Sequence, residues 1–168
     1  AAVSFIGAAE LLTEGDFVTK ADFTAAVVKA AFLDEIQLDG EKVYEDVGSS
    51  DKNFAAIGIA YRYGIIGGGR RFYPDSAISQ NEAIKMCAAV VDASVHADDT
   101  AYITYYSSKL TDNLKSAENG ELTVRNAEVL LYNMIRSKRS PKTVAPLKDD
   151  GECILSARYQ LYTTKDIV

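Results

Sequence analysis

The sequence predicts a mainly α-helical protein built from three helix–loop–helix repeats. Three observations support this class. Apolar residues recur at three- and four-residue spacing, hydroxyl and acidic residues mark helix starts, and the same order of features occurs more than once. The chain has 168 residues, which suffices for one compact domain or for several small repeats. We therefore expect repeats that share one hydrophobic core.

The first copy covers about residues 1–35. A short apolar helix leads to Gly15, and the step from Thr19 to Asp22 then opens a second helix. A hydroxyl followed three residues later by an acid has the spacing of a capping box. In that box the hydroxyl accepts from the third amide of the helix, and the acid reaches back to the cap amide. The apolar stripe that follows includes Phe23 and Val27, which indicates a face for burial.

The second copy covers about residues 44–93 and has the clearest form. An apolar helix leads to three glycines at 67–69, which we expect to make a left-handed helix stop and a tight turn. The step from Ser79 to Glu82 then repeats the capping-box spacing. This copy predicts two helices joined by a glycine turn and a loop.

The third copy, about residues 98–137, is looser. Its helix-opening step is read from Arg125 to Glu128, so its second helix is expected to start near Asn126. One helix pair cannot bury its stripe alone, whereas three second helices can close around a common axis. The repeats form an expected module at 1–138, followed at 139–168 by a linker and a short strand-like segment.

Composition narrows the functional classes. The formal charge of -6 argues against a protein that neutralises nucleic-acid phosphates. No apolar stretch approaches the ~20 residues of a membrane helix, so no membrane insertion is expected. The chain starts within a helical pattern at Ala1, which fits a removed signal peptide or a trimmed end. Cys87 and Cys153 lie in different apolar patterns, so we expect two separate buried thiols.

An ordered set of short motifs resembles one family. The sequence reads YEDV at 44–47, FAA at 54–56, GIIGG at 64–68, FYPD at 72–75 and ISQNE at 78–82. This order is similar to the S-layer homology motif, and residues 2–33 and 101–136 carry it in weakened form. The resemblance implies three motifs in a pseudo-threefold helical bundle, attached to a larger exported protein of the bacterial surface. It also implies an acidic cell-wall polysaccharide, or a glycan linked to peptidoglycan, as the ligand.

The family's helix-opening arginine is replaced in every copy. Lys20 stands there in the first copy, Gln80 in the second and Asn126 in the third, with Arg125 one residue early. The middle copy adds flexible glycines and two arginines, whose guanidinium groups grip carboxylates in a fork. The candidate glycan-binding residues are Lys20, Gly68, Gly69, Arg70, Arg71, Ser79, Gln80, Arg125 and Asn126.

No catalytic residue, metal site or cofactor is predicted. Glu82 and Glu128 are interpreted as caps rather than as a general acid and base. His96 is the only histidine, whereas a metal site needs several convergent ligands. A phosphate loop at 67–69 is the weaker alternative, because the lysine and hydroxyl of a P-loop are absent. Candidate stacking platforms for sugars are Tyr61, Tyr63, Tyr73, Tyr102, Tyr105 and Tyr106.

Two functions therefore remain open. The first is a secreted, non-catalytic module that anchors a protein to the bacterial cell wall by binding a glycan. The second is a structural spacer or protein-interaction module that kept the fold while its glycan grooves degenerated. Binding to native wall sacculi, compared with sacculi stripped of their secondary polysaccharide, separates the two.

Overall fold

The computed structural model describes residues 7–12, 17–34, 36–37, 42–92 and 109–137. This part of the chain is mainly helical and contains isolated β-bridges rather than a sheet, which confirms the predicted fold class. Its elements, in chain order, are α2 (Lys20–Ala30), α3 (Phe54–Arg62), α4 (Gln80–Val91), the short 3-10 helix η1 (Glu118–Gly120) and α6 (Val124–Arg136).

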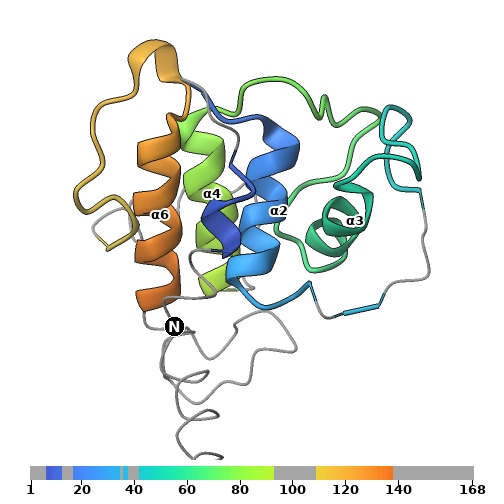
Figure 1. Ribbon diagram of the computed structural model, residues 1–168, viewed down its shortest axis with the longest axis horizontal. Helices are drawn as coiled ribbons and strands as arrows, with labels where there is room; N and C mark the ends of the chain where they lie inside the picture. Colours follow the sequence, from blue (N-terminus) through green and yellow to red (C-terminus); the bar gives the residue numbers. More distant parts are fainter. Residues whose placement is uncertain (1–6, 13–16, 35, 38–41, 93–108, 138–168) are drawn as a thin grey trace, which may run out of the picture.

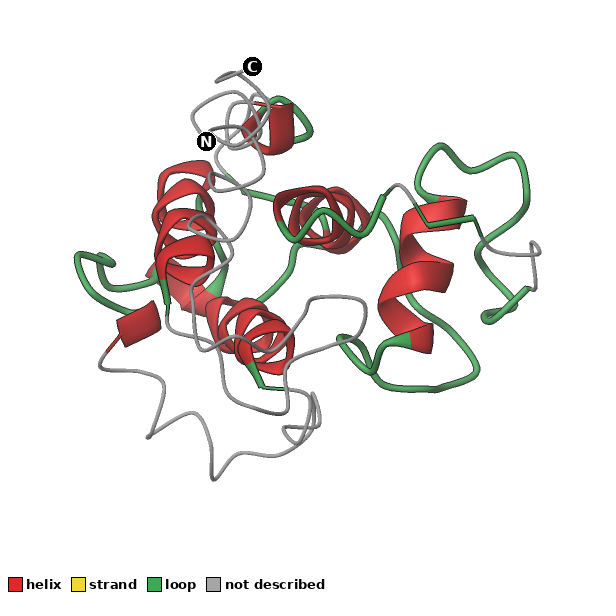
Figure 2. Ribbon diagram, turned by 90° about the horizontal axis from the view of Figure 1, so that it is seen from below, coloured by secondary structure: helices red, strands yellow, loops and turns green. Residues whose placement is uncertain are grey.

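Three of the helices form the core. α2, α4 and α6 lie side by side, and each contacts the other two (Figure 1). Seen from below, they occupy the corners of a triangle, with α3 to one side and running across their direction (Figure 2). α2 contacts all three of the other helices, and nine of its eleven residues are buried. The expected common packing is therefore present, whereas the origin of the three helices in three repeats stays a prediction.

Each core helix begins at a capping hydroxyl. The side chains of Thr19 and Ser79 accept hydrogen bonds from the third amides of α2 and α4, both at 3.1 Å, as their spacing predicts. Their acidic partners do not reach back to the caps. Asp22 binds Lys52 and Asn53 instead, and Glu82 binds Lys20.

The predicted start of the third core helix is wrong by two residues. α6 begins at Val124, and Thr123 is its cap, accepting from the Asn126 amide at 3.2 Å. Glu128, which we expected to mark this start, is exposed within the helix. Position 126, three residues after the cap, holds an asparagine in place of the acid that signals a capping box. The sequence prediction relied on the next acid, Glu128, and therefore placed the helix start two residues late.

A closed cycle of hydrogen bonds joins the three helix starts. Val18 donates its N–H to Leu122 O at 3.1 Å, Leu122 donates to Ile78 O at 2.9 Å, and Ile78 donates to Val18 O at 3.0 Å. We call these three residues the cap triangle. Each is fully buried and lies directly before a capping hydroxyl. Because every buried amide and carbonyl needs a partner, this exchange fixes the three helix starts relative to one another.

The left-handed helix stop lies earlier than predicted. Gly64, with φ of 70°, ends α3, and the Ile65 amide returns to Ala60 O at 2.8 Å. This is the usual glycine termination of a helix, where a side chain would be strained. The glycines at 67–69 have no such φ, so they do not stop the helix. They begin the loop that leads across to α4.

Cys87 is confirmed as a buried thiol in α4, and burial raises its pKa.

Several predicted features lie outside the described residues. The features outside the described residues are Gly15, His96, Tyr102, Tyr105, Tyr106, Cys153, the first residues of both outer repeats and the strand-like segment within 139–168.

Candidate glycan-binding site

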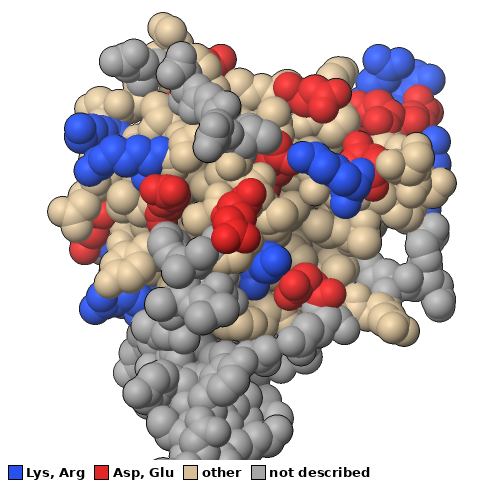
Figure 3. All heavy atoms as spheres, viewed as in Figure 1, with Lys and Arg blue, Asp and Glu red and all other residues tan. Residues whose placement is uncertain are grey.

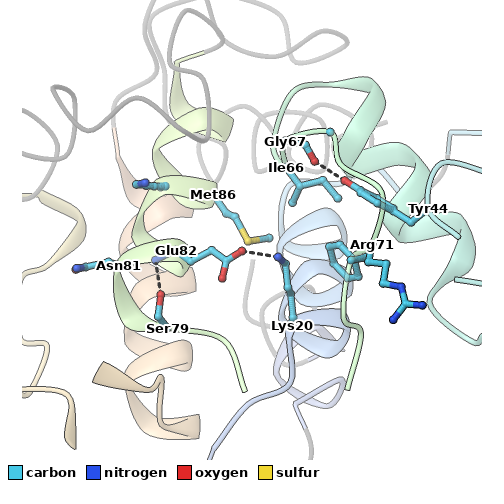
Figure 4. Close-up of a pocket in the computed structure, with 12 residues that line it drawn as sticks. Lys20, Tyr44, Ile66, Gly67, Arg71, Ser79, Asn81, Glu82 and Met86 are labelled. Atoms are coloured by element: carbon cyan, nitrogen blue, oxygen red, sulfur yellow. Dashed lines mark hydrogen bonds and ion pairs between the residues drawn. The ribbon is translucent and has the colours of Figure 1, made fainter. Parts of the chain in front are cut away.

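A pocket of about 320 Å³ lies between the starts of α2 and α4 and the loop that joins α3 to α4 (Figure 4). It is formed by residues from segments far apart in the sequence, which the cap triangle holds together. The lining residues are Lys20, Tyr44, Ile66, Gly67, Gly68, Arg71, Phe72, Ser79, Asn81, Glu82, Lys85 and Met86.

An ion pair crosses the pocket. Lys20, the first residue of α2, places its Nζ 2.7 Å from Oε1 of Glu82, the third residue of α4. Figure 4 shows the two side chains directed toward each other. The same Nζ lies 4.9 Å from the centre of the Phe72 ring, close enough for a cation–π contact. Both side chains stay partly accessible, at 22% for Lys20 and 39% for Glu82.

Aromatic rings form the wall behind this pair. Tyr44 packs against Phe72 with ring centroids 5.1 Å apart and meets Tyr61 edge-on at 6.1 Å. Its hydroxyl donates to Gly67 O. A Cβ on Gly68 would lie 3.3 Å from the Tyr61 ring, so glycine there allows the ring to pack closely against the loop. The wall is consequently fixed by packing and by one backbone hydrogen bond.

Asp46 holds the opposite end of the loop. Its two carboxylate oxygens accept from the Phe72 and Tyr73 amides, both at 2.8 Å. Burial acts to raise the pKa of Asp46, but these hydrogen bonds, the residue's own amide and the nearby Arg71 lower it below the usual value. The family-like aspartate at 46 therefore positions Phe72 and does not itself line the pocket.

Only half of the predicted glycine and arginine residues of this loop line the pocket. Gly68 and Arg71 line the pocket, whereas Gly69 and Arg70 do not. Arg70 donates through Nε to both oxygens of Glu45 at 2.9 Å, on the exposed surface. The Arg71 guanidinium is directed outward from the Lys20–Glu82 pair in Figure 4. Only one of the two arginines thus borders the cavity.

The structure does not bring Gln80, Asn126 and Arg125 to this pocket. Asn126 is 1% exposed and donates to Gln80 Oε1 at 2.7 Å and to Lys115 O at 2.9 Å. These two side chains join the starts of α4 and α6. Gln80 is the first residue of α4, as Lys20 is of α2, and Asn126 is the third residue of α6, as Glu82 is of α4. Arg125 is the second residue of α6 and is exposed. The first residue of α6, which corresponds to Lys20, is Val124.

Sequence reasoning missed most of the pocket wall. Tyr44 and Phe72 belong to the motif order but not to the predicted site residues, and the sequence pattern predicts only a capping role for Glu82. Lys85 lies one helical turn after Asn81, on the face of α4 that borders the cavity. The i, i+4 spacing of Lys85 from Asn81 places both residues on one helix face, and this spacing could have identified Lys85 from the sequence.

The net charge of the residues that line the pocket has the opposite sign to the formal charge of the whole chain. Lys20, Arg71 and Lys85 supply three cations against the single carboxylate of Glu82, in a chain whose formal charge is -6. On the face seen in Figure 3, basic and acidic side chains alternate without forming a patch of one sign. A local excess of positive charge suits an anionic ligand.

The described residues show neither a cluster of metal-ligating side chains nor a helix that could span a membrane. In that part of the chain, no three or more histidine, cysteine, aspartate or glutamate side chains gather as metal ligands do. Among the same residues, no helix has the length and apolar content required to cross a bilayer.

Comparison with known proteins gives one family. Residues 43–84 match the model of the S-layer homology domain. Neither the curated proteins nor the solved structures give a significant match. S-layer homology domains are non-catalytic modules that bind cell-wall polysaccharides and associate proteins with the cell surface. The matched segment contains Tyr44, Gly68, Phe72 and Glu82, and so most of the pocket wall. Residues 43–84 are therefore similar to one S-layer homology domain.

Proposed function

We propose that this chain is a non-catalytic module of a secreted bacterial protein, and that it anchors that protein to the cell wall by binding an acidic wall glycan. The ligand is a secondary cell-wall polysaccharide or a glycan linked to peptidoglycan. It binds in the pocket between the starts of α2 and α4. In this proposal the chain consists of three such motifs, at about 1–35, 44–93 and 98–137, within a larger exported protein.

The observation that carries the proposal is the lining of the pocket. Lys20, Arg71 and Lys85 border it, the buried rings of Phe72 and Tyr44 pack behind it, and Gly67 and Gly68 contribute no side chain. Acidic sugars present a carboxylate for the cations and hydroxyls for the polar side chains of Ser79, Asn81 and Glu82. The amino end of α4 also borders the pocket at Ser79, and a helix start favours negative charge.

Pelleting with wall sacculi tests the proposal. The purified chain should pellet with native sacculi and remain in solution with sacculi stripped of secondary polysaccharide and of other glycans linked to peptidoglycan. Equal pelleting with both preparations, or with neither, would contradict it and favour a spacer or protein-interaction module.

Two double variants that remove the same charge test whether the pocket is the binding site. Arg71→Ala combined with Lys85→Ala removes two pocket cations, whereas Arg70→Ala combined with Lys109→Ala removes one arginine and one lysine elsewhere. We expect the pocket variant to bind native sacculi roughly tenfold more weakly at low salt, with a smaller difference at high salt. The control should bind as the parent does. Equal losses in the two variants would move the site away from the pocket.

A further inference from the structure

We propose that Glu82 determines the specificity of the pocket: it keeps Lys20 from simple anions and accepts a hydroxyl from a carboxylated sugar. This inference rests on the proposed glycan-binding function. Lys20 is the cation that points into the pocket, and Glu82 holds its Nζ at 2.7 Å. Any anion that binds Lys20 must therefore compete with a carboxylate that is already in place.

The two classes of anion meet this competition differently. A simple anion such as acetate takes Lys20 and gives Glu82 nothing in return, so a carboxylate in the pocket loses its partner. A carboxylated sugar offers its acid group to Lys20 and a hydroxyl donor to Glu82. Both members of the pair then keep a partner, and the ion pair is exchanged for two new interactions.

An internal comparison shows that the junction does not need this charge for packing. The starts of α4 and α6 are joined by Gln80 and Asn126, which occupy the same helix positions as Lys20 and Glu82. That pair is neutral, and Asn126 is almost wholly buried. The cap triangle sets the same backbone relation at each helix start. A neutral amide pair thus satisfies one junction, and the charged, accessible pair occurs at the junction that borders the pocket.

Glu82 is also the only carboxylate among the residues that line the pocket. Its backbone amide is held by the Ser79 hydroxyl at 3.1 Å, so the start of α4 fixes where its side chain begins. Removing its charge without changing its size should therefore change the selectivity of the pocket and leave its shape intact.

The test uses the full 168-residue chain and four probes: sodium acetate, inorganic phosphate, methyl β-glucuronide and the neutral methyl β-glucoside. Dissociation constants are measured by NMR titration for the parent, for Glu82→Gln, and for Glu45→Gln as the control. Glu45 pairs with an arginine outside the pocket. The parent should prefer the glucuronide to both simple anions and to the glucoside.

In Glu82→Gln, acetate and phosphate should bind about two- to fivefold more tightly, because one partly exposed ion pair no longer competes. The preference for the glucuronide over acetate should fall by at least that factor, and Glu45→Gln should match the parent. An unchanged preference in Glu82→Gln, or no glucuronide binding by the parent, overturns the proposal.

Two further arrangements keep the outcome interpretable. Asparagine already occupies the equivalent position of α6, so Glu82→Asn serves if the glutamine variant fails to fold. Pelleting of the parent with sacculi reports the anchoring function separately. If the parent pellets with native sacculi and Glu82→Gln keeps its selectivity, the inference about Glu82 fails while the proposed function stands.

Discussion

Single side chains decide how the loop beside the pocket is held. Asp46 accepts from two successive backbone amides, and these place the Phe72 ring under Lys20. The side chain offers two charged acceptor oxygens only when it is ionised. The stability of the chain should therefore depend on the protonation state of this one residue.

We expect Asp46→Asn to destabilise the folded chain at neutral pH by about 1 kcal/mol, because an amide oxygen replaces two charge-assisted acceptors with one neutral acceptor. The pKa of Asp46 is lowered in the folded state, so its contribution is complete above the usual aspartate pKa of 3.8 and is lost as the pH falls through the folded value. Urea denaturation of parent and variant between pH 3 and pH 7 measures the difference. A difference in unfolding free energy that stays constant over this range contradicts the assigned role.

Residue identity also explains which site residues could be predicted. The sequence motif order identified Lys20, Gly68, Arg71 and Ser79, all of which line the pocket. It could not show that Asn126 is buried against Gln80, because that contact joins residues 46 positions apart in sequence. The pairing of Lys20 with Glu82 likewise depends on the three-dimensional relation of two helix starts.

At the scale of elements, capping hydroxyls define the helix starts more reliably than acidic residues do. Thr19, Ser79 and Thr123 all cap their helices, although the residues three positions later are Asp22, Glu82 and Asn126. The hydroxyl is the constant feature, and the third residue varies because its side chain serves a different contact at each junction. This variation is why the sequence predicted two helix starts correctly and the third two residues late.

A pair of substitutions at the third helix separates the two readings of its start. Thr123→Ala should lower the unfolding free energy by about 1 kcal/mol, as a lost cap does. Glu128→Ala should change it by less than about 0.5 kcal/mol, because this side chain is exposed and does not mark the helix start. Thermal and urea denaturation report both values. A larger loss for Glu128→Ala than for Thr123→Ala would restore the start that the sequence pattern suggested.

On the scale of the whole molecule, the mainly α class and the packing of three core helices follow from apolar spacing. The closed hydrogen-bond cycle at Val18, Ile78 and Leu122 does not. These residues look like ordinary apolar positions before a cap, and their exchange of backbone hydrogen bonds depends on long-range closure. That closure brings the starts of α2 and α4 together, and it is the structural reason that a pocket exists there.

A second open groove of about 470 Å³ provides a contrast within the molecule. It lies at the last turns of α6 and is lined by Lys109, Asp112, Asn113, Tyr132, Asn133, Arg136 and Ser137. It also contains an aromatic ring beside a guanidinium group, with Arg136 lying 5.0 Å from the Tyr132 ring centre. This groove is an alternative candidate surface for a wall glycan, and a direct experiment can separate it from the pocket between α2 and α4.

That experiment is a titration of the ¹⁵N-labelled chain with purified wall polysaccharide, followed amide by amide by NMR. The account predicts that the largest shifts cluster at the pocket, on the amides of Lys20, Gly67, Gly68 and Glu82. The amides of Asn133 and Arg136 should stay unchanged. Shifts centred on α6 with the pocket amides unmoved, or no shifts at polysaccharide concentrations that saturate pelleting, would contradict the claim that the pocket between α2 and α4 binds the wall glycan.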